Sequence, residues 1–231
     1  MKRLGLGLLA AVTAGCSLAG NGYIAVQQRG VAGFNRLRVT GPFSVEVHDG
    51  RDFQLTLLTD SNLFDHVETR LEAETLAVSF MPESAALSAS ALRVIVELPS
   101  LAGAELSGSG KLRAVVHAPR HDVDLALDGS GQLTLVGDVG AVDTWTTGTG
   151  TCTLTGTASS WTATVDGTAK VDGQEMPADD AALSMLGDGA LLAVVNHTVA
   201  FDVRGAGSID WWGEAAVASS SQAGPGTVTH H

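Results

Sequence analysis

The residues of this sequence best suited to chemistry are aspartates that recur at fixed distances from a glycine turn. Asp124 and Asp143 lie seven residues before the final position of a turn, and Asp128 and Asp166 lie three before it. β-Helical enzymes that act on polysaccharides use clustered carboxylates, sometimes with calcium or a basic partner. No His-Gly or Arg-x-Lys set of the kind found in polygalacturonases accompanies these aspartates. We therefore interpret them as solvated turn and strand carboxylates, and we predict no catalytic residues.

Two tryptophans are the residues best suited to contact a ligand. Strand alternation places Trp145 and Trp212 outward, where an indole ring can stack on a sugar ring or fill a partner's pocket. The competing interpretation is packing against a loop, a cap or a neighbouring subunit. Trp161 and Trp211 fall at inward positions, so we expect both in the core.

The histidines and the internal cysteine do not indicate a metal centre. His117 and His121 are the closest internal pair of histidines, but they fall where a strand meets a turn rather than on one helix face. Cys152 lies among apolar positions and is expected to be a buried, unreactive thiol. The sequence therefore predicts neither a metal site nor a cofactor.

These residues are carried by a repeat that dominates the second half of the chain. A Gly-x-Gly turn recurs, and its successive final positions are separated by 21, 19, 19, 20, 18 and 19 residues. A near-constant period of this kind is the signature of a solenoid. The turns are Gly108-Ser109-Gly110, Gly129-Ser130-Gly131, Gly148-Thr149-Gly150, a degenerate Gly167-Thr168-Ala169, Gly187-Asp188-Gly189, Gly205-Ala206-Gly207 and Gly224-Pro225-Gly226.

Apolar residues occupy the same positions in every repeat. Three such columns alternate with polar ones, which is the period of a β-strand and not of a helix. One coil cannot bury its own apolar side chains, whereas stacked coils bring each column into register. We therefore predict an all-β, right-handed parallel β-helix with coils of roughly 19 residues, and a β-sandwich is the alternative. The columns are Leu112, Leu133, Cys152, Val171, Leu191 and Ile209; Leu106, Leu127, Thr146, Val165, Met185 and Val203; and Ala102, Val123, Val142, Trp161, Ala181 and Val199.

The chain divides into segments of different regularity. Residues 101–226 are predicted to form the β-helix repeats, followed by a tail at 227–231. The less regular region 29–100 has strand-like segments and is expected to supply the first coils or a cap for the open end. In the fourth repeat, Gln174 to Asp180 breaks the pattern, which indicates a distorted coil or a protruding loop. The strand-like segments are 36–40, 43–48, 53–59, 76–80 and 92–98.

The first residues read as an export signal. Lys2 and Arg3 precede a short apolar stretch, which ends in the small residues Ala14-Gly15-Cys16. We predict a lipoprotein-type signal peptide at 1–15, Cys16 as the lipidated mature N-terminus and a linker at 16–28, with ordinary signal cleavage as the alternative. The protein is therefore expected to be exported, and to be either lipid-anchored to the outer membrane, or periplasmic or at the cell surface.

The charge of the chain excludes one class of partner. The formal net charge is −12, and such an acidic surface repels phosphate backbones, so we expect no nucleic-acid binding. The remaining partners are a membrane reached through the lipid anchor, a glycan and an envelope protein. The oligomeric state is not encoded in any pattern of the sequence.

Three segments of the first half resemble a known family. Phe34 to Val47 followed by Asp49-Gly50, then Asp60-Ser61-Asn62-Leu63, then Val94 to Leu101 resemble the head GIN domain, and the repeated glycine turns fit the same pattern. The resemblance covers roughly residues 29 to 226. It implies a family described as heads of auto-transporter adhesins, mostly exported or lipid-anchored bacterial proteins with β-helical folds. Its motifs specify turns and core columns and carry no catalytic residues.

The sequence therefore predicts a non-enzymatic, exported envelope or cell-surface protein that acts as an adhesin-like binding or structural module. Two alternatives remain. One is a carbohydrate-active β-helix enzyme, either a polysaccharide hydrolase or a lyase, and it would need three or more carboxylates that converge in a groove. The other is a subunit of an envelope assembly.

Overall fold

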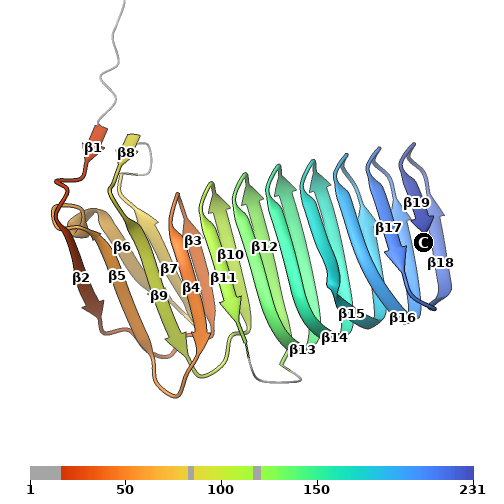
Figure 1. The fold of residues 1–231 in the computed structure, drawn as a ribbon, viewed down its shortest axis with the longest axis horizontal. Helices are drawn as coiled ribbons and strands as arrows, with labels where there is room; N and C mark the ends of the chain where they lie inside the picture. Colours follow the sequence, from red (N-terminus) through yellow and green to blue (C-terminus); the bar gives the residue numbers. More distant parts are fainter. Residues whose placement is uncertain (1–16, 83–85, 117–120) are drawn as a thin grey trace, which may run out of the picture.

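The fold is a β-solenoid of about seven turns, each of roughly 19 residues. The computed structural model describes residues 17–82, 86–116 and 121–231, so the predicted signal peptide and Cys16 lie outside the described residues. Successive coils lie side by side along the long axis of the molecule (Figure 1). Within the described part of the chain, the only helical element is a short 3-10 helix, η1 (Phe64–His66). No helix there is long and apolar enough to cross a membrane.

The regular part of the solenoid consists of strands that pair in parallel from one coil to the next. Each coil contributes one strand segment to each of two opposite faces, and the long strands bend from one face to the other. A β-sandwich would instead pair its strands mainly antiparallel, so the parallel β-helix prediction is confirmed. These strands are β12 (Val123–Gly129), β13 (Gln132–Gly148), β14 (Thr151–Gly167), β15 (Lys170–Met185), β16 (Ala190–Val203), β17 (Ser208–Trp212), β18 (Ala216–Gln222) and β19 (Thr227–His230).

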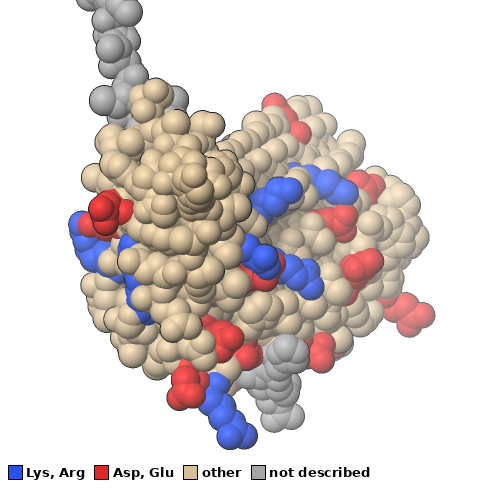
Figure 2. All heavy atoms as spheres, turned by 60° about the vertical axis from the view of Figure 1, so that its left-hand side comes forward, with Lys and Arg blue, Asp and Glu red and all other residues tan. Residues whose placement is uncertain are grey.

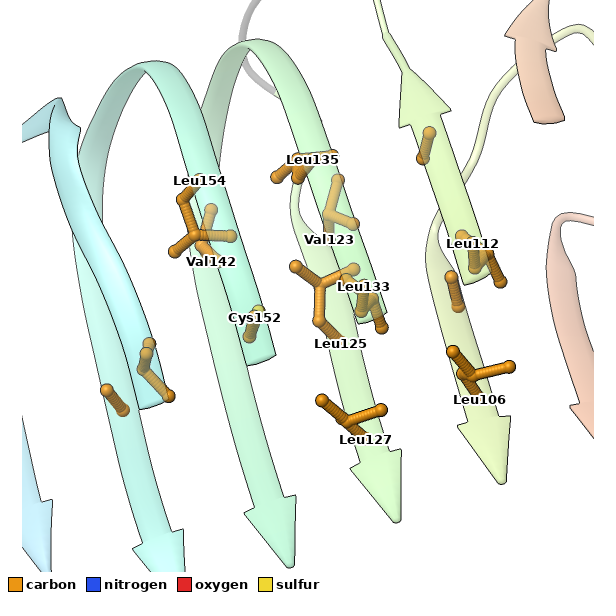
Figure 3. Close-up of a cluster of buried hydrophobic side chains, with 14 of the residues drawn as sticks. Leu106, Leu112, Val123, Leu125, Leu127, Leu133, Leu135, Val142, Cys152 and Leu154 are labelled. Carbon is orange, nitrogen blue, oxygen red and sulfur yellow. The ribbon is translucent and has the colours of Figure 1, made fainter. Parts of the chain in front are cut away.

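The core consists of the predicted apolar columns. Leu133 of β13 pairs directly with Cys152 of β14, and Cys152 pairs with Val171 of β15. All three side chains are buried. Figure 3 shows members of these columns as sticks on successive coils. Each inward position is therefore covered by the equivalent position of the coils before and after it, which is how a chain of short strands acquires a continuous core.

The glycine turns recur because the coils approach each other closely at this edge. At Gly148, φ is +83°, and an added Cβ would lie 2.5 Å from the carbonyl oxygen of Gly129 in the preceding coil. At Gly129 the corresponding distance to the Gly108 carbonyl oxygen is 2.7 Å. A side chain at either position would therefore push neighbouring coils apart as well as strain the backbone.

The irregular fourth repeat stays within the solenoid. The register of β15 slips by one residue against β14 between Thr153 and Thr155 and shifts again against β16, yet the strand is continuous from Lys170 to Met185. The prediction of a distorted coil therefore fits the bulged strand, and a protruding loop does not form. Near these register shifts, Gly173 lies against Trp161, and an added Cβ there would lie 2.6 Å from the indole ring. Bulges absorb such an extra residue without ending a strand.

The N-terminal half supplies two further coils in an order that does not follow the sequence. β3 and β4 pair with β10 and β11 on one side and with β7 and β9 on the other. The chain therefore builds the β3–β4 coil first, adds the β7–β9 coil outside it, and then crosses back to continue with β10. The strands are β3 (Arg36–Thr40), β4 (Ser44–Asp49), β7 (Thr75–Phe80), β9 (Leu92–Leu98), β10 (Gly103–Gly108) and β11 (Lys111–Val115).

Antiparallel strands close the N-terminal end of the solenoid. β5 (Gln54–Asp60) pairs with β9, β2 (Ile24–Arg29) pairs with β5, and β6 (Val67–Glu72) pairs with β7, all antiparallel. β1 (Ser17–Ala19) and β8 (Ala86–Ser88) form a small separate sheet at the same end (Figure 1). The N-terminal region thus provides both coils and a cap.

The segments predicted as a linker and a tail contain strands. The predicted linker at 16–28 contains β1 and most of β2, and the predicted tail at 227–231 contains β19, which pairs with β17. Both segments are strands because each satisfies the hydrogen-bonding edge of an otherwise terminal strand. Neither has the strong alternation of apolar residues that marks a strand in sequence.

Candidate functional site: a groove beside Trp145

The clearest hollow near a predicted ligand contact is an open groove of about 360 Å³ across one face of the solenoid. It crosses β7, β3, β10, β12 and the second half of β13, and we call it the Trp145 groove. Its walls combine aromatic, acidic and basic side chains. The lining residues are Arg36, Leu37, Arg38, Thr75, Gly103, Ala104, Glu105, Asp124, Leu125, Ala126, Asp143 and Trp145.

The strand register explains why the surface is hollowed here. Gly103 of β10 sits between Arg36 of β3 and Asp124 of β12, and it has no side chain to fill the space above the sheet. In the next row, Ala126 separates Glu105 from the indole of Trp145. Small residues thus form the floor, and larger charged or aromatic residues stand on either side.

The guanidinium of Arg36 lies across the floor of the Trp145 groove. A Cβ on Gly103 would come within 2.8 Å of Arg36 Nη1, so the glycine is what lets this side chain pass over β10. Arg36 Nη2 then donates to Asp124 Oδ2 on the far side. Because Gly103 has no side chain, Arg36 of β3 can reach Asp124 of β12, although these two strands are far apart in the sequence.

A second arginine is held in place beside the first. Arg38 Nε donates to Glu105 Oε2 at 2.8 Å, and Arg38 Nη1 lies 3.3 Å from Glu72 Oε2. The hydrogen bond from Arg38 to Glu105, together with their opposite charges, raises the pKa of the guanidinium. Exposed ion pairs add little to stability, so their main effect here is to fix the orientation of donors and acceptors.

Asp143 is the carboxylate of the groove that is not engaged by an arginine. It lies directly opposite Asp124 on the neighbouring strand. Partial burial and then the negative charge of Asp124 raise the pKa of Asp143. Among the residues that the structure describes, no hydrogen bond or ion pair satisfies this carboxylate, so it can accept hydrogen bonds from a ligand.

The two predicted tryptophan contacts lie in different places. Trp145 stands on the rim of the groove with 49% of its surface exposed. Trp212 is half-buried near the C-terminal end, where its ring stacks on His231 at 4.5 Å and 14°. The neighbouring Trp211 is buried and stacks on His230 at 3.8 Å and 9°. The stack with His231 occupies the Trp212 ring, so Trp145 is the better placed of the two tryptophans for a ligand.

Two other chemically interesting residues, Cys152 and Asp128, are accounted for by packing and by a contact between coils, whereas His117 lies outside the described residues. Cys152 is buried, and burial raises the pKa of its thiol to about 12, so the reactive thiolate is suppressed. Asp128 accepts a hydrogen bond from Thr147 at 2.7 Å across the coils. Within the described ranges, no three histidine, cysteine, aspartate or glutamate side chains are placed to bind a metal ion.

Sequence reasoning missed the basic half of the groove. Arg36 and Arg38 are visible as alternating outward residues of a strand, but nothing in the sequence shows that β3 lies against β10. The out-of-order coil brings them to Glu105 and Asp124. Gly103 was missed as well because it falls outside the Gly-x-Gly series, and its role appears only when its neighbours are known.

Comparison with known proteins agrees with this architecture. The model of the family described as "Putative auto-transporter adhesin, head GIN domain" matches residues 33–215. The chain belongs to the head GIN domain family. The comparison with curated proteins finds no match.

Solved structures from Bacteroides fragilis and Parabacteroides distasonis have a similar fold. A "putative adhesin" from Bacteroides fragilis aligns with a TM-score of 0.81 at 17% identity, covering 93% of this chain and 100% of the other. A "Putative lipid binding protein" from Parabacteroides distasonis aligns with a TM-score of 0.69 at 17% identity, covering 93% and 99%. At this level of identity the similarity shows the shared fold alone.

Proposed function

We propose that this head GIN domain protein is an exported, non-catalytic, adhesin-like binding module of a bacterial envelope. The observation that carries the proposal is the Trp145 groove, in which an exposed indole stands beside oriented charged groups on a rigid scaffold. Exposed aromatic residues next to fixed polar groups are typical of binding surfaces. The family description, adhesin, supports the same function.

The state of the carboxylates favours binding over catalysis. Glu105, Asp124 and Asp143 all line the groove, which is the arrangement that a carbohydrate-active enzyme would need. However, Glu105 is paired with Arg38 and Asp124 with Arg36, so only Asp143 is available to a substrate. Hydrolysis of a glycosidic bond needs two available carboxyl groups, one as the acid and the other as the base or nucleophile. Release of new reducing ends or unsaturated sugars by the purified protein would establish the enzyme alternative.

We also propose that Cys16 anchors the protein through lipid. The first described strand, β1, begins at Ser17 next to the capped end of the solenoid (Figure 1). An anchor at Cys16 would hold this end at the membrane while the later coils extend from it. Cys16→Ala should abolish labelling with a fatty-acid analogue and move the protein from the membrane to the soluble fraction. Unchanged labelling and fractionation would contradict the anchor.

The binding function can be tested with the protein starting at Ser17. Beads coated with it should bind purified bacterial envelope fragments or host epithelial surfaces, and Trp145→Ala should reduce that binding at least tenfold. Trp212→Ala, which removes an indole outside the groove, is the matched control and should bind like the wild type. Equal binding by the wild type and Trp145→Ala, or no binding to either surface, would overturn the proposal.

A further inference from the structure

We propose that the Trp145 groove binds an uncharged glycan chain, with one sugar ring stacked on the indole of Trp145 and its hydroxyls bonded to Asp143 and Arg36. This inference rests on the proposed binding function and names its ligand class and site. It is carried by four properties of the groove: an available aromatic face, oriented polar groups, nearly balanced charge and extension across several strands.

The indole of Trp145 offers a flat apolar surface to a ligand. About half of the side chain is exposed, and its register partners on β12 and β14 are Ala126 and Thr164, which are too small to cover it. A pyranose ring has an apolar face of C–H groups and a rim of hydroxyls. Stacking that face on the indole would remove apolar surface from water on both sides, which is favourable.

The polar groups beside Trp145 match the hydroxyls on the rim of a sugar. A hydroxyl donates one hydrogen bond and accepts others, so it fits best between a carboxylate and an arginine. Asp143 supplies free acceptor sites, and Arg36 retains N–H donors beyond the one that it gives to Asp124. Because the ion pair with Asp124 already fixes Arg36, a ligand would lose less free energy in ordering that side chain.

The charge of the groove favours an uncharged polymer. Two arginines face three carboxylates in the lining, so the formal charges nearly cancel, at −1. Acidic and basic side chains are likewise interspersed on the surface seen in Figure 2, where the N-terminal end comes forward. An anionic polymer would need an excess of positive charge, which neither the groove nor the chain, at −12, provides.

The length of the surface favours a chain of several sugars. From β3 to β13 the groove crosses three strand spacings, which is about 14 Å at the usual separation of strands. A second hollow of about 300 Å³ continues past β3 over β7 and β6, and Arg38 lines both. The ligand is therefore an oligosaccharide that lies across the strands.

The test is an array of neutral oligosaccharides, including β-glucan, mannan, xylan and chitin fragments, with heparin and polygalacturonate as anionic probes. The protein starting at Ser17 should bind at least one neutral oligosaccharide and bind it at least tenfold more tightly than the corresponding monosaccharide. Trp145→Ala should weaken this binding at least tenfold, Trp145→Phe should restore most of it, and Trp212→Ala should have no effect. Circular dichroism and thermal melting will show that each variant is folded.

The outcomes separate this inference from the proposed function. If envelope binding depends on Trp145 but neutral oligosaccharides neither bind nor compete, the ligand class is wrong and the binding module stands. Trp145-dependent binding of heparin or polygalacturonate in place of neutral chains would also overturn the ligand class. If neutral glycans bind equally to the wild type and Trp145→Ala, the site is wrong. If no envelope surface binds, the proposed function fails.

Discussion

The two ends of the solenoid are built on different principles. From β12 onward, every coil repeats the same turn, the same inward columns and the same parallel pairing, so each coil is held mainly by its neighbours. The N-terminal end has antiparallel strands and an out-of-order coil. Any number of similar coils can stack on one another, whereas the exposed core and strand edges of a terminal coil must be covered by contacts specific to that end.

Asp60 shows how local contacts close the N-terminal end. This carboxylate is fully buried, and it accepts hydrogen bonds from the backbone N–H of Gly22 and from the N–H and hydroxyl of Ser90. Desolvation alone would raise its pKa, but these hydrogen bonds outweigh it and lower the pKa of Asp60. One side chain thus joins the chain before β2 to the end of β5 and to the segment before β9.

The Trp145 groove lies where these two regions meet. Arg36 and Arg38 come from the inserted β3–β4 coil, whereas Asp143 and Trp145 come from the regular repeats. The groove with its mixed charge therefore spans the junction between the inserted coil and the regular stack.

The largest expected loss of stability follows from placing a charge in one of the buried apolar columns of the regular part. Leu133→Asp would place an unpaired charge where only 1% of the side chain is exposed, and we expect it to cost roughly 4 kcal/mol or more and to leave the protein unfolded or aggregated. Solubility and circular dichroism will measure this. Gln132→Asp, one residue earlier and exposed, is the control and should fold normally. A soluble, folded Leu133→Asp protein would show that the column is misplaced.

A smaller loss of stability is expected when an alanine replaces a glycine, and two such variants distinguish the close approach of coils from the strain of a left-handed backbone. Gly148 and Gly33 both have φ of +83°, but an added Cβ meets the Gly129 carbonyl oxygen at 2.5 Å in the first case and nothing within 4 Å in the second. Gly33→Ala should therefore cost about 1 kcal/mol from the left-handed backbone alone. Gly148→Ala should cost about 2 kcal/mol more because neighbouring coils must move apart. Urea unfolding will measure both, and equal losses would contradict the stacking argument.

The cap should be the acid-sensitive part of the molecule. Because the pKa of Asp60 is lowered in the folded protein, the stability that it contributes is present above the ordinary aspartate value of about 3.9 and is lost as the pH falls below it. Asp60→Asn should lower the melting temperature at pH 7 and flatten its dependence on pH between about 5 and 2. The exposed Asp52→Asn is the control. An unchanged acid profile in Asp60→Asn would contradict this role.

The smallest expected effect is a gain in stability, whereas the preceding substitutions destabilise the protein. Asp143 has a raised pKa, so its ionised form is disfavoured in the folded protein, and this penalty is present at neutral pH and disappears as the pH falls through the folded pKa. Asp143→Asn should therefore stabilise the protein at pH 7 by up to about 0.5 kcal/mol, with no gain in acid. Asp166→Asn, whose partner across the strands is Thr147, should show no such gain. A loss of stability in Asp143→Asn would contradict the repulsion from Asp124.

Part of the fold could be predicted from the sequence because its signals are local and repeated. The columns that contain Leu133 and Trp161, and the period of the Gly-x-Gly turns, follow directly from alternation and spacing. A second glycine column at the opposite edge, Gly137 and Gly156, was missed although its members are also 19 residues apart. The strands at each end were missed because edge strands need not bury an apolar face.

The sequence by itself determined the solenoid, its period, its inward columns and the outward position of Trp145, because each coil repeats the same local pattern of alternation and glycine. Only the tertiary structure decided what surrounds Trp145. The order of coils depends on which strand edges pair, and edge pairing is made by backbone groups that are alike in every residue. The insertion of β3 between β7 and β10 brought Arg36 across Gly103 to Asp124, and that insertion turned a repeating surface into a groove.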